Sequence, residues 1–339
     1  MSFNPLRWPR NIKLIVAFGV LYVVWGSTYL GIRIGLQAGM PPALFAGLRL
    51  VPAGLLMLAF AKWRGQSVRI PLSEYRIVAT VGVLLLVGGM YFTFLAERSI
   101  PSGLSALIVA LLPLWIALAE YALPGMDRPS ARGILGLVIG FTGLGVLMAP
   151  RITGIHGTPE QFLGIGLQVL GTWLWTGGSV LSKRRPVKTD AIVATGYEML
   201  TAGVVLLFIG TVLGEWNGFA ITPSGAGALA YLIIMGSCVA FTAFVWLLRN
   251  APASKVMTYA YVNPVIAVFL GWLVLREPID GWVLAGMAII VAGVALTTSA
   301  PTRPARGMTP MPSAETLLAA DEAELLAEAS GAGSVEAAS

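Results

Sequence analysis

Two ionisable residues each lie inside an otherwise apolar stretch of helix length, at equivalent positions of a repeat. Gly47-Leu48-Arg49 aligns with Gly196-Tyr197-Glu198, about 150 residues further along the chain. A charge inside an apolar span costs about 2.5–3.5 kcal/mol on insertion scales, so it usually faces a cavity or a partner. Arg49 could attract a substrate carboxylate, and Glu198 could attract an amine or carry a proton. The alternative is that backbone carbonyls or hydroxyls at a helix–helix contact satisfy both charges.

Aromatic side chains and one amide form a second group of candidates. Trp25 and Tyr29 are four residues apart and share a helix face, as do Tyr259 and Asn263. A cavity edged by Trp and Tyr would suit a substrate with an apolar body and a polar handle. Aromatic residues also fill cores and form interfacial belts, which is the competing interpretation. Beside Arg49 and Glu198, the predicted substrate-binding residues are Trp25, Tyr29, Tyr91, Trp175, Tyr259 and Asn263.

Prolines and glycines form a third group. Pro113 and its repeat counterpart Pro264 lie in the middle of apolar runs, where each removes a backbone hydrogen bond and is expected to kink its helix. The glycines are spaced for close helix packing, and this surface would also suit a homodimer, although nothing in the sequence requires one. These glycines are Gly136, Gly140, Gly143, Gly286 and Gly293.

The elements that must position these residues are membrane helices. The chain has 339 residues, of which 57% are hydrophobic and 11% charged. A soluble chain of this length would be about a quarter charged, so we expect lipid to be its main solvent. A spanning helix needs about 20 mostly apolar residues. Ten candidate spans lie at roughly 13–33, 42–61, 76–95, 101–122, 132–149, 163–182, 191–213, 225–247, 253–274 and 281–299.

The basic residues predict the orientation of these spans. Both tails and the even-numbered connections carry seventeen of the 22 Lys and Arg residues, whereas the opposite side carries only Arg33, Arg98, Arg151 and Arg276. The remaining basic residue is Arg49, inside a span. Because positive charge accumulates on the cytoplasmic side, both termini are predicted to be cytoplasmic. The net charge of +6 then follows from cytoplasmic loops that face anionic lipid, and needs no nucleic-acid partner.

The chain is an internal duplication. Ile100-Pro101-Ser102 aligns with Ala251-Pro252-Ala253, and the alignment extends through the two central prolines. An odd number of five spans in each half makes the halves insert upside down, as an inverted repeat around a shared central site. Arg49 would then lie toward the outside and Glu198 toward the inside, about 10 Å apart along a core of about 30 Å. The predicted parts are an N-terminal tail (1–12), a first repeat (13–149), an external loop (150–162), a second repeat (163–299) and a disordered cytoplasmic tail (300–339).

Trp25-Gly26-Ser27-Thr28-Tyr29, followed by Gly31 and then Arg49, resembles the drug/metabolite transporter superfamily, and within it the EamA branch of ten-span exporters. The glycine-rich fifth and tenth spans extend this resemblance. So does an acidic residue nine positions before a span glycine, at Asp127 and at Glu277, although Asp127 stands where the family often has Glu. The resemblance covers residues 13–299. It implies export of amino acids or other small metabolites, and relatives elsewhere in the superfamily carry nucleotide sugars.

Motifs for other functions are missing from the sequence. No phosphate-binding loop or His-Glu-x-x-His motif occurs, and the single histidine and single cysteine exclude a multi-cysteine metal site, so we expect no cofactor and no enzyme. The sequence therefore predicts an all-α, ten-helix inner-membrane secondary transporter that exports small metabolites by alternating access. A drug, nucleoside or lipid transporter of the same fold is the alternative.

Overall fold

The computed structural model describes residues 9–303, except 97, 101–104, 106–107, 125, 127, 150–157, 218 and 276–279. This part of the chain is almost entirely helical. The elements are α1 (Arg10–Gln37), α2 (Pro42–Trp63), α3 (Leu72–Gly82), η2 (Val83–Tyr91), α4 (Phe92–Ala96), α6 (Leu112–Ala122), β1 (Arg128–Pro129), α7 (Ala131–Met148), α8 (Pro159–Arg184), α9 (Ala191–Val212), α10 (Pro223–Tyr231), η4 (Leu232–Phe241), α11 (Thr242–Asn250), α12 (Ala253–Val256), α13 (Tyr259–Leu275), α14 (Gly281–Ser299) and β2 (Thr302–Arg303).

Six of the described helical runs are long and apolar enough to cross a membrane. They are Arg10–Gln37, Pro42–Trp63, Leu72–Ala96, Ala191–Val212, Pro223–Asn250 and Gly281–Ser299. Two shorter apolar helices, Leu112–Ala122 and Ala131–Leu147, fall below that length. The protein is therefore an all-α, multi-pass membrane protein. The count of ten spans stays a prediction.

Local chemistry explains where several helices begin and end. The side chains of Ser130, Asp190 and Asp280 each accept a hydrogen bond from the first turn of α7, α9 and α14, which satisfies an otherwise unpaired backbone N–H. Thr158 begins α8 with a reciprocal capping box to Gln161. Turns that follow α1, α2 and α9 contain glycine at positive φ, at Gly39, Gly65 and Gly214.

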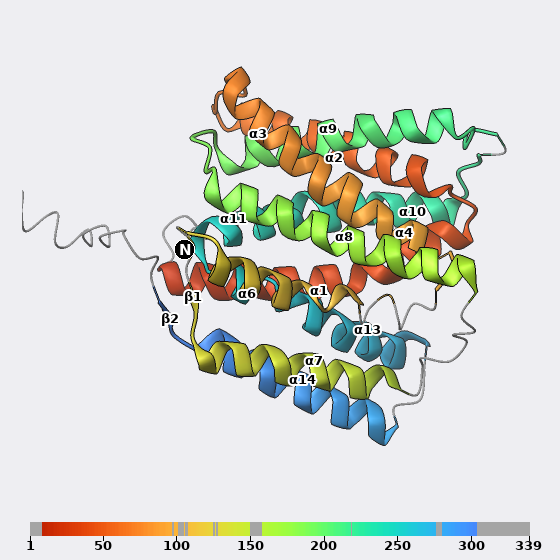
Figure 1. Cartoon of the computed structure of the whole chain (residues 1–339). Helices are drawn as coiled ribbons and strands as arrows, with labels where there is room; N and C mark the ends of the chain where they lie inside the picture. The colour runs from red at the N-terminus through yellow and green to blue at the C-terminus, as the bar shows by residue number, and fades with distance from the viewer. Residues whose placement is uncertain are drawn as a thin grey trace, which may run out of the picture.

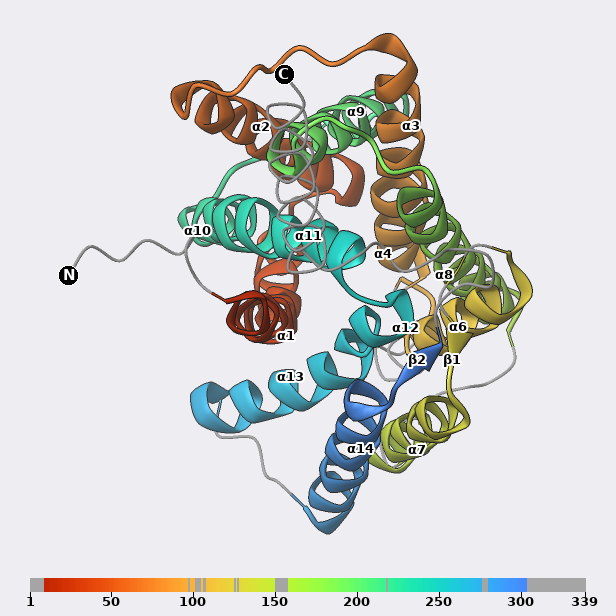
Figure 2. The same ribbon diagram turned by 90° about the vertical axis from the view of Figure 1, so that its left-hand side faces the viewer.

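The helices run side by side in one bundle, most of them across the page in Figure 1, and Figure 2 shows the bundle turned by 90°. α2 packs along α9 at one edge of the bundle, and α7 packs along α14 at the opposite edge. Between these two pairs, α1 packs against α13 and η4, while α8 packs against α6 and η2. The largest apolar cluster lies in this middle region and includes Leu21, Leu50 and Phe244.

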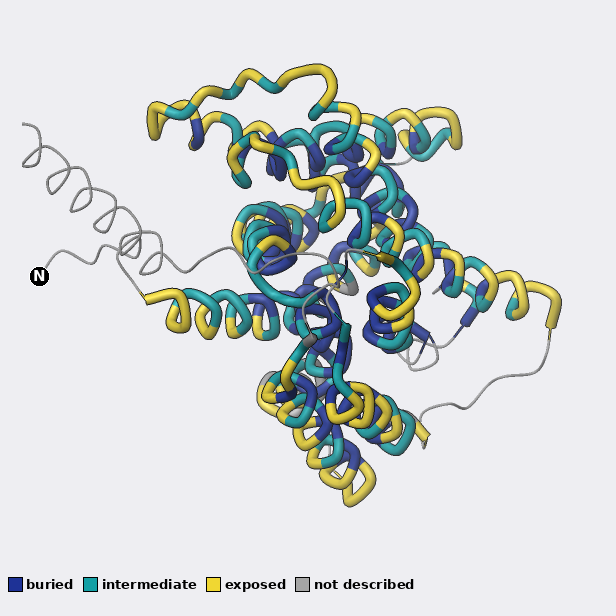
Figure 3. The backbone as a smooth tube through the Cα atoms, turned by 60° about the vertical axis from the view of Figure 1, so that its left-hand side comes forward, coloured by how far each residue is buried: buried dark blue, intermediate teal, exposed yellow. Residues whose placement is uncertain are grey.

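Buried residues follow the inner faces of the helices, and exposed residues follow the outward faces (Figure 3). Many outward residues are large and apolar, such as Phe208 on α9 and Leu284 on α14. A water-soluble monomer rarely exposes so much apolar surface, whereas lipid solvates it favourably. The burial pattern therefore agrees with a membrane location.

Two short features differ from a simple set of α-helices. η2 and η4 are π-helical segments, in which each hydrogen-bonded turn is one residue wider than in an α-helix. β1 and β2 form an antiparallel pair with Arg128 opposite Arg303. Residues 302–303 lie in this pair, and residues 304–339 lie outside the described residues.

Candidate functional site

Arg49 is buried on α2, on the side that faces η4 and η2, with only 7% of its surface exposed. Its Nε donates a hydrogen bond of 2.9 Å to Oγ of Ser237, which belongs to η4. Its Nη1 lies 3.9 Å from Sδ of Met90, on η2, which is a weak acceptor. Within the described residues no carboxylate pairs with this guanidinium. Of its five N–H donors, therefore, only one meets a strong acceptor in the part of the chain that the structure describes.

Gly236 lets the guanidinium approach η4 closely. A Cβ at this position would lie 3.0 Å from Nη2 of Arg49, which is tighter than ordinary van der Waals contact. Gly236 precedes Ser237, so one turn of η4 supplies both the open space and the hydroxyl. Wide π-helical turns occur often at functional sites, because they change which backbone and side-chain groups face a cavity.

Trp25 is the centre of an aromatic cluster beside Arg49. Its ring centroid lies 4.8 Å from that of Tyr259, 5.1 Å from that of Phe244 and 5.9 Å from that of Trp175. Phe241 completes the group, with its centroid 6.3 Å from that of Trp25. These tilted and edge-to-face contacts are favourable between aromatic rings. α1, α8, η4, α11 and α13 thus each contribute a ring to what we call the aromatic cluster.

The aromatic cluster and the arginine are joined through Gly236. Nε1 of Trp25 donates a hydrogen bond of 3.1 Å to the carbonyl of Gly236, the same residue against which the guanidinium lies. A cation and an apolar aromatic surface therefore share one residue of η4. The combination can hold a ligand with an anionic group and an apolar body.

Glu198 is also buried, with 3% of its surface exposed, and its Oε2 has no hydrogen-bond partner among the described residues. It lies on α9 where α3 approaches closely, since a Cβ at Gly82 would lie 2.5 Å from the backbone oxygen of Glu198. A buried acceptor without a donor is costly unless a proton or a ligand satisfies it. A proton or a cationic group could satisfy this oxygen, and the role of Glu198 stays a prediction.

In the part of the chain that the structure describes, two more polar atoms in or next to the aromatic cluster are buried without a partner. They are Oδ1 of Asn263, one turn beyond Tyr259 on α13, and Nε1 of Trp175. Asn263 is 2% exposed. One of these atoms accepts and the other donates, so together they could satisfy complementary groups of a polar ligand.

The remaining predicted residues have no described contact with Arg49 or the aromatic cluster. Tyr91 is buried in the main apolar cluster at the end of η2, and Tyr29 lies on α1 with a side chain outside the described residues. Pro113 occupies the first turn of α6, where proline is tolerated, so it follows a break between helical segments instead of kinking a continuous helix. Pro264 lies inside α13. Asp127 and Glu277 lie outside the described residues.

The sequence analysis did not single out several residues that the structure brings to this region. Ser237 and Gly236 contact Arg49, and Phe241 and Phe244 contact Trp25. Glu120, on α6, is fully buried as well. An acidic residue in an apolar run was visible in the sequence, whereas the partners of Arg49 and Trp25 depend on how distant helices pack. Among the described residues, no group of three or more His, Cys, Asp or Glu side chains could hold a metal ion.

Comparison with known proteins identifies the family of the chain. The profile of the EamA-like transporter family matches the chain twice, at residues 13–149 and 162–299. The chain is 35% identical over 294 residues to the uncharacterized inner membrane transporter YedA of Escherichia coli (strain K12), covering 86% of this chain and 93% of YedA.

More distant relatives extend the comparison. An uncharacterized transporter of Archaeoglobus fulgidus is 26% identical over 292 residues, covering 85% of this chain and 98% of that protein. A chloroplastic WAT1-related protein of Arabidopsis thaliana is 27% identical, covering 81% of this chain and 67% of that protein. A solved crystal structure shares the fold, with a TM-score of 0.74 and 24% identity over 86% of this chain and 97% of that chain. With a buried arginine beside an aromatic cluster, and a family match in both halves, this multi-pass membrane protein belongs to the EamA-like transporter family.

Proposed function

We propose that the chain is a secondary transporter of the inner membrane that exports amino acids or closely related small metabolites. In this proposal the substrate binds centrally, between two inverted halves of five spans each, and alternating access moves it across the membrane. The family assigns transport but not the cargo, so the cargo is argued from the site.

The observation that carries the proposal is the electrostatic state of Arg49. A buried guanidinium that meets one hydroxyl and one thioether keeps a large unsatisfied demand for an anion. Structural arginines in membranes pair with carboxylates or backbone carbonyls, whereas an arginine at a transport site must leave room for its ligand. A substrate carboxylate is the small anionic group that fits this role.

The neighbouring groups suit the rest of an amino-acid-like molecule. The aromatic cluster offers an apolar surface for a side chain. Oδ1 of Asn263 is a buried acceptor that an ammonium group would satisfy, and Nε1 of Trp175 is a buried donor that a second carboxylate oxygen would satisfy. Glu198 is placed at another level of the bundle, where it can carry the coupled proton.

Reciprocal contacts support an inverted repeat. On the α2–α9 pair, a Cβ at Gly47 would contact Leu207, and a Cβ at Gly196 would contact Leu58. Gly196 is the repeat counterpart of Gly47, and Leu58 is that of Leu207, at an offset of about 149 residues. Likewise, on the α7–α14 pair, a Cβ at Gly136 would meet Thr297, and a Cβ at Gly286 would meet Leu147. An offset of about 150 residues exchanges these two contacts. Such exchange is expected when a twofold axis in the membrane plane relates the two halves.

The helix neighbours exchange in the same way. In the proposed first half, α1 packs against α13 and η4 of the second half. The counterpart of α1 is α8, which packs against α6 and η2 of the first half. In the proposed orientation, α1 begins on the cytoplasmic side, and α6, α8, α11 and α14 end there. These ends lie together in the structure, because Arg10 contacts Asn250 and Lys255 contacts Thr298.

Counterflow in proteoliposomes tests the proposal. Proteoliposomes that contain the purified protein would be preloaded with an unlabelled amino acid. Uptake of labelled aromatic, aliphatic and hydroxy amino acids would then be followed. The native chain would be compared with Arg49→Ala and Arg49→Lys. We expect saturable exchange by the native chain, no exchange by Arg49→Ala and reduced exchange by Arg49→Lys, which keeps the charge but not the planar fork of donors. Exchange of nucleosides, drugs or lipids in place of amino acids would contradict the cargo, and equal exchange by Arg49→Ala would contradict the site.

A further inference from the structure

The segment that joins α11 to α13, residues 250–258, contains no exposed residue. We call it the corner. It contains the four-residue helix α12 and a turn at Met257 and Thr258, and Ala253, Val256, Met257 and Thr258 are all fully buried. The corner lies at the end of the bundle where α1 begins, since Arg10 contacts Asn250 there. Its packing against neighbouring helices covers the bundle at that end.

A carboxylate from another helix holds the corner. Glu120, on the last turns of α6, has 0% of its surface exposed, and its Oε1 accepts a hydrogen bond of 3.2 Å from the backbone N–H of Ser254. Within the described part of the chain, its Oε2 is buried without a hydrogen-bond partner. The ammonium group of Lys183, on α8, is close enough to act electrostatically on this carboxylate. A buried carboxylate is a costly way to join two helices, so a purely structural link would be better made by apolar side chains.

Basic side chains from two further helices bind the carbonyls at the start of the corner. Nζ of Lys183 donates a hydrogen bond of 2.9 Å to the carbonyl of Ala251. Nη2 of Arg10, on α1, donates one of 3.2 Å to the carbonyl of Asn250. Both carbonyls belong to the end of α11, where a helix attracts cations. The corner is thus held from α1, α6 and α8 at once.

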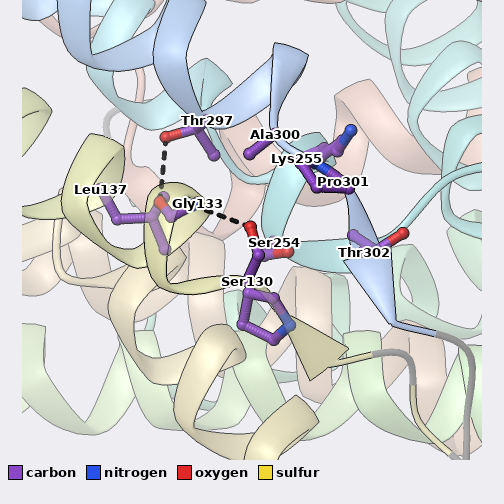
Figure 4. A pocket seen from close by; sticks show the side chains of 10 residues that line it. Ser130, Gly133, Leu137, Ser254, Lys255, Thr297, Ala300, Pro301 and Thr302 are labelled. Atoms are coloured by element: carbon purple, nitrogen blue, oxygen red, sulfur yellow. Dashed lines mark hydrogen bonds between the residues drawn. The ribbon is translucent and has the colours of Figure 1, made fainter.

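On its other side the corner meets the ends of α7 and α14. Nζ of Lys255 donates a hydrogen bond of 2.7 Å to the carbonyl of Thr298. Figure 4 shows the small pocket beside this contact, in which Ser254 and Lys255 face Ser130 at the start of α7 and Thr297 on α14. Lys255 therefore links the corner to α14 at the edge of this pocket.

The corner is continuous with the aromatic cluster. Thr258 ends the corner, and its hydroxyl lies 2.6 Å from the hydroxyl of Tyr22 on α1. The next residue is Tyr259, whose ring lies on Trp25. A movement of the corner would therefore shift Tyr259 against the proposed substrate site. Coupling of this kind needs a contiguous element that can take two arrangements.

From these contacts we infer that Glu120 is the latch of a gate, formed by residues 250–258, that closes the end of the bundle at which α1 begins. The inference rests on the proposed alternating-access function and identifies the residue that holds one of its two states. Breaking the bond between Glu120 and the N–H of Ser254 frees the corner, and the path from the aromatic cluster to that end opens. Glu120 acts through the corner, so it is a positioning residue and need not touch substrate.

The rate at which a thiol in the corner reacts with a maleimide reports whether the gate is open, and this measurement needs no substrate. Val256→Cys in a Cys238→Ser background places one thiol in the buried corner of the full-length protein, and a membrane-impermeant maleimide is added to vesicles from one side or the other. The test variant is Glu120→Leu, which removes the bond but keeps an apolar volume that favours folding. We expect labelling to become at least about tenfold faster, since a hydrogen bond to a charged group typically stabilises a state by that factor or more. The increase should occur from one side of the membrane only.

Two controls separate a latch from general loosening. Glu120→Gln keeps an oxygen that can accept the Ser254 N–H, and should label about as slowly as the native chain. Ile116→Ala removes a fully buried apolar side chain one turn earlier on α6, and should also leave labelling slow. Unchanged labelling of Glu120→Leu, an equal increase in either control, or an increase from both sides would overturn the inference. A negative counterflow result with amino acids would contradict the proposed cargo but leave the labelling result fully readable.

Discussion

Arg49 and Glu198 lie on adjacent, antiparallel helices, yet at levels of the bundle about two helical turns apart. Gly54 on α2 faces Leu200 on α9, and Val51 faces Gly203, which fixes the register of the pair. In that register Arg49 lies opposite a position about seven residues beyond Glu198, or about 10 Å along the helix axis. The two charges therefore occupy separate levels, and each is available for its own interaction.

The first prediction concerns Glu198. Because its Oε2 is buried without a partner, Glu198→Gln should fold and insert normally, since the amide has the same shape and carries its own donor. If Glu198 carries the coupled proton, the variant should still exchange substrate in counterflow but lose uptake driven by a pH gradient. The measurement is transport at several imposed gradients, with Arg49→Lys as a variant that weakens binding without removing proton coupling. Gradient-driven transport equal to that of the native chain would exclude the proton-carrier role.

A second prediction tests the close approach of Arg49 to η4. In Gly236→Ala the new Cβ would lie 3.0 Å from Nη2 of Arg49, and the flexible arginine must move by a few tenths of an ångström or more. Small displacements of a binding group can lower rates by up to about 100-fold, so we expect a raised KM or lost exchange in a protein of native stability. Gly227→Ala on α10, where nothing lies within 4 Å, is the matched control and should behave as native. Native kinetics in Gly236→Ala would show that Arg49 does not work from this position.

A third prediction concerns the α7–α14 pair. A Cβ on Gly293 would lie 2.3 Å from the backbone nitrogen of Gly140 and 2.7 Å from the carbonyl of Gly136. Backbone atoms cannot yield cheaply, so Gly293→Ala should cost about 1–3 kcal/mol of stability. Thermal unfolding in detergent would register this as a lower Tm. Gly145→Ala on α7, with nothing within 4 Å, should leave Tm unchanged, and an equal loss there would contradict the packing argument.

The sequence alone was sufficient to predict that this is a membrane protein and to predict its family, because apolar runs and the duplicated motifs are local signals. It also placed Trp25, Trp175 and Tyr259 among the candidates, by residue type and repeat position. Their mutual contact was not predictable, since residues of α1, α8 and α13 meet only through the packing of distant helices. The approach of Arg49 to Gly236 has the same cause.

The burial of Glu120 and the π-helical turns of η2 and η4 were not predicted from the sequence, for different reasons. Glu120 lies in an apolar run and gives the same signal as Glu198, but it is near the end of its run, where a charged residue can reach water. Its burial comes from the corner that folds over it. The π-helical turns of η2 and η4 have no comparable signal, because the choice between an α and a π turn depends on small differences in packing.

The last prediction separates binding from stability at Asn263. Its Oδ1 is buried without a partner, so the amide contributes little to the free energy of unfolding in the absence of substrate. Replacing an unsatisfied polar group with an apolar one of similar size is nearly neutral or stabilising. Asn263→Leu should therefore keep or raise Tm while it lowers exchange, because the proposed acceptor for the substrate ammonium is lost. A control is Thr142→Val on α7, where the exposed hydroxyl donates to the carbonyl of Val138 outside the proposed substrate site and the corner, and it should leave exchange unchanged. If Asn263→Leu lowers Tm and leaves the KM for exchange unchanged, Asn263 is a packing residue and the substrate's ammonium must bind elsewhere.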